Sequence, residues 1–202
     1  TAKKVAAHLK SLGLEVQTGI AHHGVLGVLK GAKPGPTVAL RADMDALPVT
    51  EQVDLPFASK VRSTFNGQDV GVMHACGHDV HTTCLLGAAR ILNELKDQWD
   101  GTIKLIFQPG EEKNPGGASI LIKEGVLKNP VPQRIYAQHV HPQLEVGRMN
   151  FSAGKVMASA DEIYITIHGR GGHAAAPHLT ADTLLIASHL VVSLQQIISR
   201  NN

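Results

Sequence analysis

Three apolar runs in this chain each end in side chains that can bind a metal ion or transfer a proton. The runs cover residues 37–40, 101–107 and 134–140, and amphipathic helical patterns lie between them at residues 80–96 and 116–125. This alternation predicts βαβ units, and therefore an α/β fold whose mostly parallel sheet carries helices on both faces. Such sheets bind ligands beyond the carboxyl ends of their strands. The polar side chains expected there are Asp43, Asp45, Glu111, Glu112, His139 and His141.

Other segments extend the pattern of this first domain. An apolar stripe at helical spacing predicts a first helix that ends at Gly13, and short strands are expected at residues 14–18 and 24–30. The sequence FNGQD, at residues 65–69, predicts a hairpin or loop turn. Asp79 is expected to cap the helix that follows it.

The end of the chain predicts the start of a second domain. After a further expected strand at residues 146–152, small residues indicate a hinge, so we place a first α/β domain at residues 1–157 and a second domain at residues 158–202. Apolar and polar residues alternate over residues 161–169, as in a half-exposed strand, and an apolar amphipathic helix is expected at residues 182–198. Because one strand and one helix cannot bury each other's faces well, we expect an incomplete α+β domain.

Composition restricts the partners and the compartment. Hydrophobic residues make up 43% of the 202 residues and charged residues 18%, as in ordinary globular proteins. A formal charge of +2 and 3% aromatic residues offer nucleic acid neither a charged surface nor stacking groups, so no nucleic-acid partner is expected. No signal-peptide pattern and no apolar run of about 18 residues is present, so no membrane partner is expected either. Two cysteines make no disulfide framework, and we predict a cytoplasmic location.

The sequence MHACGHDVH, at residues 73–81, concentrates metal-binding groups. On a helix, Cys76 and His78 would point about 200° apart, but in a turn they can converge, and Gly77 supplies the backbone freedom. Thiolate and imidazole together favour Zn, and carboxylates in the same shell would widen the choice to Mn. The alternative is a buried cysteine beside a histidine that only caps the helix. The neighbouring His74, Asp79 and His81 favour the metal site over that alternative.

The adjacent carboxylates Glu111 and Glu112 can divide two tasks. Neighbouring side chains point in different directions, so one can bind a metal ion while the other reaches a water molecule bound to it. Two solvated loop glutamates are the alternative. His139 and His141 share one face of an extended strand end, and either could complete the site or lie on the surface as an ordinary histidine.

His173 lies in a run of glycine and alanine, HGRGGHAAAPH, at residues 168–178. Small neighbours let a ligand approach closely and leave the imidazole exposed as a donor to developing negative charge. A tight turn with an incidental histidine is the alternative. These glycines match no phosphate-binding pattern, so nucleotide binding is not expected.

Taken together, these motifs resemble those of one enzyme family. RADMDALPV, GVMHACGHDVH, FQPGEE and GRGGHAAAPH, in this order and spacing, are similar to motifs of the M20 metallopeptidase clan. The resemblance is to the amidohydrolase branch of the clan, which includes hippurate hydrolases, N-acyl-amino-acid amidohydrolases, N-acetyldiaminopimelate deacetylases and auxin-conjugate hydrolases. It extends from about Val38 to the end of the chain.

The resemblance implies a zinc-peptidase-like catalytic domain with two divalent metal ions, Zn or Mn, with Co or Ni also admitted. It also implies a satellite domain, here residues 158–202, through which such enzymes usually form homodimers. The implied metal ligands are Cys76, His78, Glu112 and His139. Glu111 is the implied general base, Asp45 a supporting carboxylate, and His173 a group that binds the substrate carbonyl or its tetrahedral intermediate.

The implied reaction is metal-dependent hydrolysis of the amide bond of an N-acyl amino acid or related small amide. Members of the family carry one further metal-binding histidine after the satellite domain, and the sequence has no such segment. We therefore expect a fragment of a chain about twice as long. Two alternatives stay open: a hydrolase with Cys76 as nucleophile, and a catalytically incompetent fragment that only binds metal or associates.

Overall fold

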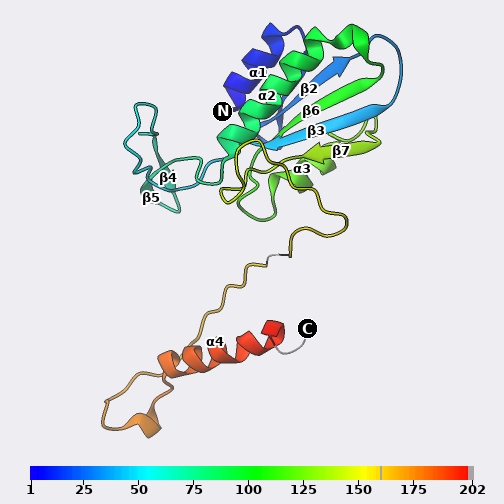
Figure 1. The fold of residues 1–202 in the computed structure, drawn as a ribbon. Helices are drawn as coiled ribbons and strands as arrows, with labels where there is room; N and C mark the ends of the chain where they lie inside the picture. The colour runs from blue at the N-terminus through cyan, green and yellow to red at the C-terminus, as the bar shows by residue number, and fades with distance from the viewer. Residues whose placement is uncertain (160, 200–202) are drawn as a thin grey trace. The chain divides into compact units, whose positions relative to one another are not determined.

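A five-stranded sheet organises the first part of the chain (Figure 1). The computed structural model describes residues 1–159 and 161–199. The strands lie in the order β1-β2-β6-β3-β7, and within this sheet only β2 runs against its neighbours. The predicted mostly parallel α/β sheet is therefore confirmed. The strands are β1 (Glu15–Ile20), β2 (Gly24–Lys30), β3 (Thr37–Asp43), β6 (Thr102–Gln108) and β7 (Arg134–Ala137).

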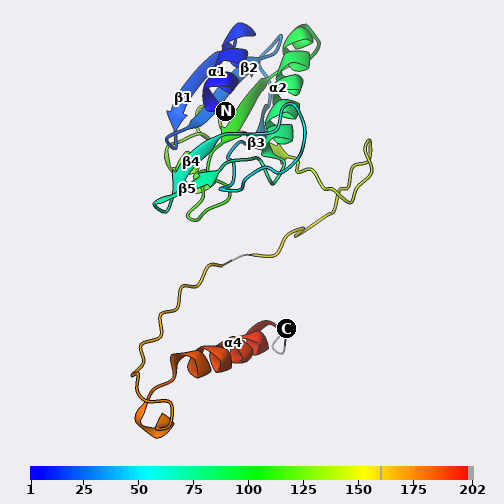
Figure 2. The same cartoon turned by 90° about the vertical axis from the view of Figure 1, so that its left-hand side faces the viewer.

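Helices cover both faces of this sheet, as predicted. Helices α1 (Ala2–Ser11) and α2 (His78–Glu94), labelled in Figure 2, pack on one face, and α3 (Gly117–Lys123), labelled in Figure 1, packs on the other. Alternate residues of β6 face the two sides, because side chains along a strand point to opposite faces. Leu105 and Phe107 join the core under α1 and α2, whereas Ile106 joins the core under α3.

Lys104 is a buried cation in the central strand β6, with only 1% of its surface exposed. Its Nζ donates hydrogen bonds to the carbonyl oxygens of Lys128 at 2.7 Å and Pro130 at 3.1 Å. Burial lowers the pKa of this amine, because desolvation penalises the charged form. The two bonds tie the centre of the sheet to the segment that leads into β7.

Several local predictions can be compared with the structure. The turn at Asn66-Gly67 joins a hairpin of β4 (Arg62–Phe65) and β5 (Gln68–Gly71), as expected, and this pair lies apart from the main sheet. Asp79 does not cap α2. The helix begins at His78, two residues earlier than an Asp79 cap would require, and the capping position belongs to Gly77, whose φ of 80° suits glycine. A short 3₁₀ helix, η1 (Lys96–Gln98), follows α2.

Residues after Gly147 form a second unit, Arg148–Asn202. Its described part contains the 3₁₀ helix η2 (Pro177–Leu179) and the predicted long helix, α4 (Thr183–Ser199). The strands predicted at residues 146–152 and 161–169 are wrong for the described residues. Alternation alone cannot make a strand, because its backbone must pair with a neighbour. Among the described residues of this unit, the only pairing is one isolated bridge, between Arg170 and Ala181. The domain boundary predicted after residue 157 stays a prediction.

None of the helices described over residues 1–159 and 161–199 combines the length and the apolar character that crossing a membrane requires.

The packing of β6 yields a stability prediction. Replacing Leu105, which is fully buried, by alanine should lower the free energy of unfolding by about 2–5 kcal/mol, because it removes apolar contacts and leaves a cavity. The same change at Ile91, which is 57% exposed on α2, should cost less than about 1 kcal/mol. Urea unfolding of both variants measures the difference, and equal losses would contradict this description of the core.

Candidate metal centre

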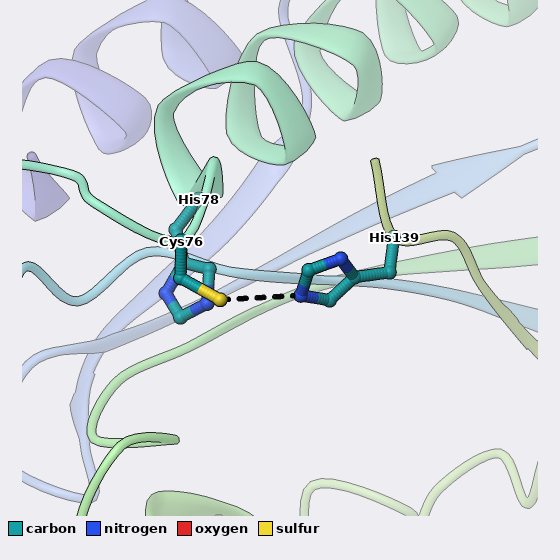
Figure 3. A group of neighbouring side chains, drawn as sticks. All are labelled: Cys76, His78 and His139. Carbon is teal, nitrogen blue, oxygen red and sulfur yellow. Dashed lines mark hydrogen bonds between the residues drawn. The ribbon is translucent and has the colours of Figure 1, made fainter. Parts of the chain in front are cut away.

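The polar groups predicted from separate motifs meet at one end of the sheet. Asp43 is the last residue of β3, Gln108 the last of β6, and His139 follows β7 by two residues. Parallel strands end at the same edge, so these three strands deliver their terminal side chains to one place. The turn before α2 adds Cys76, as Figure 3 shows.

Cys76, His78 and His139 form the first group of potential ligands (Figure 3). The Sγ atom of Cys76 lies 3.4 Å from Nε2 of His139, and one ligand atom from each of the three residues lies within 4.8 Å of the others. His78 is buried, Cys76 is partly buried and His139 is exposed. The turn at Gly77 therefore brings together two side chains that a helix would have separated.

The Nδ1 atoms of both histidines are engaged by backbone carbonyls. Nδ1 of His78 lies 3.0 Å from the carbonyl oxygen of Asp45, and Nδ1 of His139 lies 2.7 Å from that of Val140. Because a carbonyl only accepts, Nδ1 carries a proton in each ring, and the neutral form of the ring therefore has its lone pair on Nε2. This is the arrangement by which an outer partner orients a histidine for metal binding.

Two carboxylates extend the group. One ligand atom each from His78, Glu111 and Glu112 forms a second set within 4.8 Å. The backbone N–H of Glu112 donates to Oδ2 of Asp45 at 3.0 Å, so Asp45 supports both Glu112 and His78. The side chain of Glu112 is 25% exposed and directed inward, whereas Glu111 is exposed.

Unsatisfied atoms show that this donor set suits a cation. Nε2 of His78 and Oε1 of Glu112 are both buried, and neither has a hydrogen-bond partner among the described residues. The two atoms are 3.8 Å apart. Buried polar atoms without partners are costly, and a cation that both could bind would remove the cost. Nitrogen, oxygen and sulfur donors of this kind suit Zn, and the carboxylate and imidazole donors tolerate Mn.

The surroundings of Cys76 are unfavourable for a free thiolate. Burial is the largest effect that raises the pKa of its thiol, and the negative charge and hydrogen bond of Glu112 raise it further. Reactive cysteines instead lie in electropositive surroundings that lower their pKa. The same negative field would stabilise a bound divalent cation, which deprotonates a coordinated thiol.

The other predicted residues differ in their placement. His141 is exposed and belongs to none of the potential metal-binding groups found among the described residues. His173 lies in the second unit, where its Nδ1 accepts a hydrogen bond from the N–H of Ala175 at 3.1 Å. The roles of all the predicted site residues remain predictions.

Asp43 and His81 were named among the polar residues of the sequence motifs, but neither was given a role of its own. Asp43 and His81 are 1% exposed, and Oδ1 of Asp43 lies 2.6 Å from Nδ1 of His81. Helical spacing could have found His81, because it lies three residues after His78 and so shares its face of α2. Asp43 was expected only as one of several polar side chains beyond the strand ends, two residues before Asp45.

One known protein family matches most of this chain. The family model described as Peptidase family M20/M25/M40 matches residues 39–200. The chain belongs to this family. The match confirms the resemblance drawn from the four motifs.

Individual members of the family are similar over nearly the whole chain. An N-acetyl-L-cysteine deacetylase of Bacillus subtilis is 42% identical over 193 residues, which is 96% of this chain and 44% of that protein. The IAA-amino acid hydrolase ILR1-like 4 of Arabidopsis thaliana is 44% identical over 200 residues, or 99% of this chain and 43% of that protein. The chain therefore spans about half the length of the curated relatives it matches.

A solved structure of an M20 family member is also similar to this chain. The YXEP protein of Bacillus subtilis, described as a dinuclear metal-binding peptidase of the M20 family, is 41% identical with a TM-score of 0.64. The match covers 72% of this chain and 38% of that one.

The raised pKa of Cys76 can be tested by alkylation of the metal-free protein. In a Cys84→Ser background, Glu112→Gln should accelerate the reaction of Cys76 with iodoacetamide at pH 8, because losing a negative charge lowers the thiol pKa and increases the thiolate fraction. Glu94→Gln, an exposed carboxylate at the end of α2, is the matched control and should have no effect. Equal rates in all three proteins would contradict the assigned cause.

Proposed function

We propose that a protein containing this chain hydrolyses the amide bond of N-acyl amino acids with two divalent metal ions. The observation that carries the proposal is the pair of unpartnered atoms, His78 Nε2 and Glu112 Oε1, that face each other beside Cys76 and His139. Family membership supports hydrolase chemistry at this position.

Four side chains are proposed to hold the cations: Cys76, His78, Glu112 and His139. Asp45 is proposed to support them, because it accepts hydrogen bonds through its carbonyl from His78 and through its carboxylate from Glu112. Zn is the ion that the thiolate favours, whereas Mn, Co and Ni suit the remaining donors. When bound, such ions acidify a water molecule and polarise the substrate carbonyl.

Glu111 is proposed to act as the general base. One of its carboxylate oxygens lies within 4.8 Å of a potential ligand atom of His78 and of Glu112, and its exposure leaves it accessible to solvent and substrate. In the proposed reaction, Glu111 removes a proton from the attacking water and later delivers it to the departing amine.

His173 is proposed to stabilise the negative charge that develops on the carbonyl oxygen. Its Nδ1 accepts the N–H of Ala175, so the neutral ring carries its proton on Nε2. That tautomer can donate a hydrogen bond to an oxyanion. The residues from 158 onward are proposed to belong to a satellite domain that forms homodimers. Homodimerisation and a cytoplasmic location stay predictions.

The names of the relatives support the proposed substrate class. One is named as a deacetylase of N-acetyl-L-cysteine, and another as a hydrolase of IAA-amino acids. We extend to this chain only the shared chemistry, an acyl group joined to an amino acid through its nitrogen. A nucleophilic role for Cys76 is disfavoured, because burial and the nearby carboxylates hold its thiol protonated.

The proposed division between adjacent carboxylates predicts opposite behaviour of two matched variants. Glu111→Gln should retain metal binding and lose at least about 100-fold in turnover, because only the base is removed. Glu112→Gln should weaken metal binding itself, because a ligand loses its charge. Elemental analysis after dialysis measures metal binding, and hydrolysis of N-acetyl and N-benzoyl amino acids measures turnover.

These measurements use the 202-residue chain and the longest natural protein that contains it. An unimpaired Glu111→Gln enzyme would exclude Glu111 as base. A longer protein that binds metal but hydrolyses none of these amides would favour the non-catalytic alternative.

Metal removal separates the two hydrolase alternatives. Chelation should abolish hydrolysis, and added Zn or Mn should restore it, whereas iodoacetamide applied to the metal-loaded protein should react slowly with Cys76 because the metal ion occupies its sulfur. Activity that survives chelation but not alkylation would establish the cysteine hydrolase instead.

A further inference from the structure

His81 is buried beside the candidate metal centre with both ring nitrogens engaged. Its Nε2 accepts a hydrogen bond from the backbone N–H of Val140 at 2.9 Å, and its Nδ1 lies 2.6 Å from Oδ1 of Asp43. A backbone N–H can only donate, so Nε2 must be the acceptor and Nδ1 must carry the proton. The neighbours of His81 therefore fix its tautomer.

Both carboxylate oxygens and the backbone carbonyl of Asp43 have hydrogen-bond partners. Its Oδ2 lies 2.7 Å from Nη1 of Arg41, and Arg41 in turn donates from Nε to Oε1 of Gln108 at 2.9 Å. Its carbonyl accepts a hydrogen bond from Oγ1 of Thr82 at 3.0 Å. Burial would raise the pKa of Asp43, but the hydrogen bond from His81 and the charge of Arg41 hold it below its usual value. Asp43 is thus a fixed anion at the end of a central strand.

The bond from Val140 to His81 fixes the segment that carries His139. The rings of His81 and His139 are in edge contact, with centroids 4.4 Å apart. The side chain of Val140 lies against Gly77, where a β-carbon would come within 2.4 Å of Val140 Cγ2. His81 and Gly77 therefore hold residues 139–140 against the turn that contains Cys76.

We propose that Asp43 and His81 are a positioning pair that sets His139 in place as a metal ligand, with His81 acting through the Val140 N–H. The inference rests on the proposed function. It assigns to these two residues the task of holding a ligand in place without binding the metal ion themselves. It explains why a histidine so close to the potential ligands directs neither of its nitrogens toward them.

An alternative role for His81 is metal binding together with Asp43 and His78, whose potential ligand atoms lie within 4.8 Å of one another. Both nitrogens of His81 and both oxygens of Asp43 already have partners. A cation there would have to displace the Val140 N–H and lie beside the guanidinium of Arg41. The existing bonds favour positioning.

Two substitutions of similar size separate these roles. The amide of His81→Gln can place an acceptor near the position of Nε2, whereas the shorter amide of His81→Asn reaches only the position of Nδ1. His81→Asn should weaken Co²⁺ binding about 10- to 100-fold and alter the thiolate-to-cobalt charge-transfer band of Cys76. His81→Gln should keep most of the affinity and the band of the parent. Co²⁺ titration of the 202-residue chain, followed by absorption spectroscopy, measures both.

Thr82→Val is the matched control, because it removes a buried hydrogen bond to the same Asp43 without affecting Val140. It should reduce the free energy of unfolding but not the Co²⁺ affinity. If the parent binds Co²⁺ and His81→Asn binds it equally tightly, the positioning role is overturned, whereas the proposed metal centre is not. A parent that binds no Co²⁺ overturns the metal centre itself, and with it the role proposed here.

Hydrogen exchange in the metal-free chain tests the bond independently of any ion. The Val140 amide should be protected in the parent and in His81→Gln, and should exchange faster in His81→Asn. Rapid exchange of this amide in the parent would overturn the proposal, even if His81→Asn failed to fold.

Discussion

The parallel pairing of β3 with β6 and β7 is the constraint on which the candidate centre depends. Register places Asp43 of β3 opposite Gln108 of β6, and Arg41 of β3 opposite Ala137 of β7, so the polar groups that follow these strands share one edge. A shift of one residue in either pairing would move the carboxylates and His139 relative to Cys76. The chemistry proposed for this chain is therefore a consequence of strand register as much as of residue type.

Hydrogen bonds at this edge fix orientation as well as position. Asp45 uses its carbonyl for His78 and its carboxylate for the backbone of Glu112, and Val140 uses its carbonyl for His139. Each histidine proposed as a ligand thus presents Nε2, whereas His81 presents neither nitrogen. Three neighbouring histidines thus differ in whether a ring nitrogen is available to bind a metal ion, and their hydrogen-bond partners cause the difference.

Much of this arrangement could be predicted from the sequence, and particular residues show where prediction ended. Apolar runs followed by Asp43, Glu111 and His139 were sufficient to predict the sheet and the edge at which these polar groups lie, because the spacing of apolar residues is a local property of the sequence. The sequence could not distinguish the exposed His141, or His81 with both of its ring nitrogens bonded, from the histidines proposed as metal ligands. That difference depends on bonds between segments that are distant in the chain. The strand predicted at residues 161–169 was wrong because alternation does not reveal whether a pairing partner exists.

The order of strands in the sheet also bears on the synthesis of the protein. β3 is made before both of its neighbours in the sheet, β6 and β7, which lie beyond α2 in the chain. On a ribosome, β3 would therefore emerge with both edges unpaired and would wait for some sixty further residues before its first partner appeared. Exposed strand edges invite pairing with other chains. The nascent chain would thus be most prone to aggregation in the interval before β6 inserts between β2 and β3.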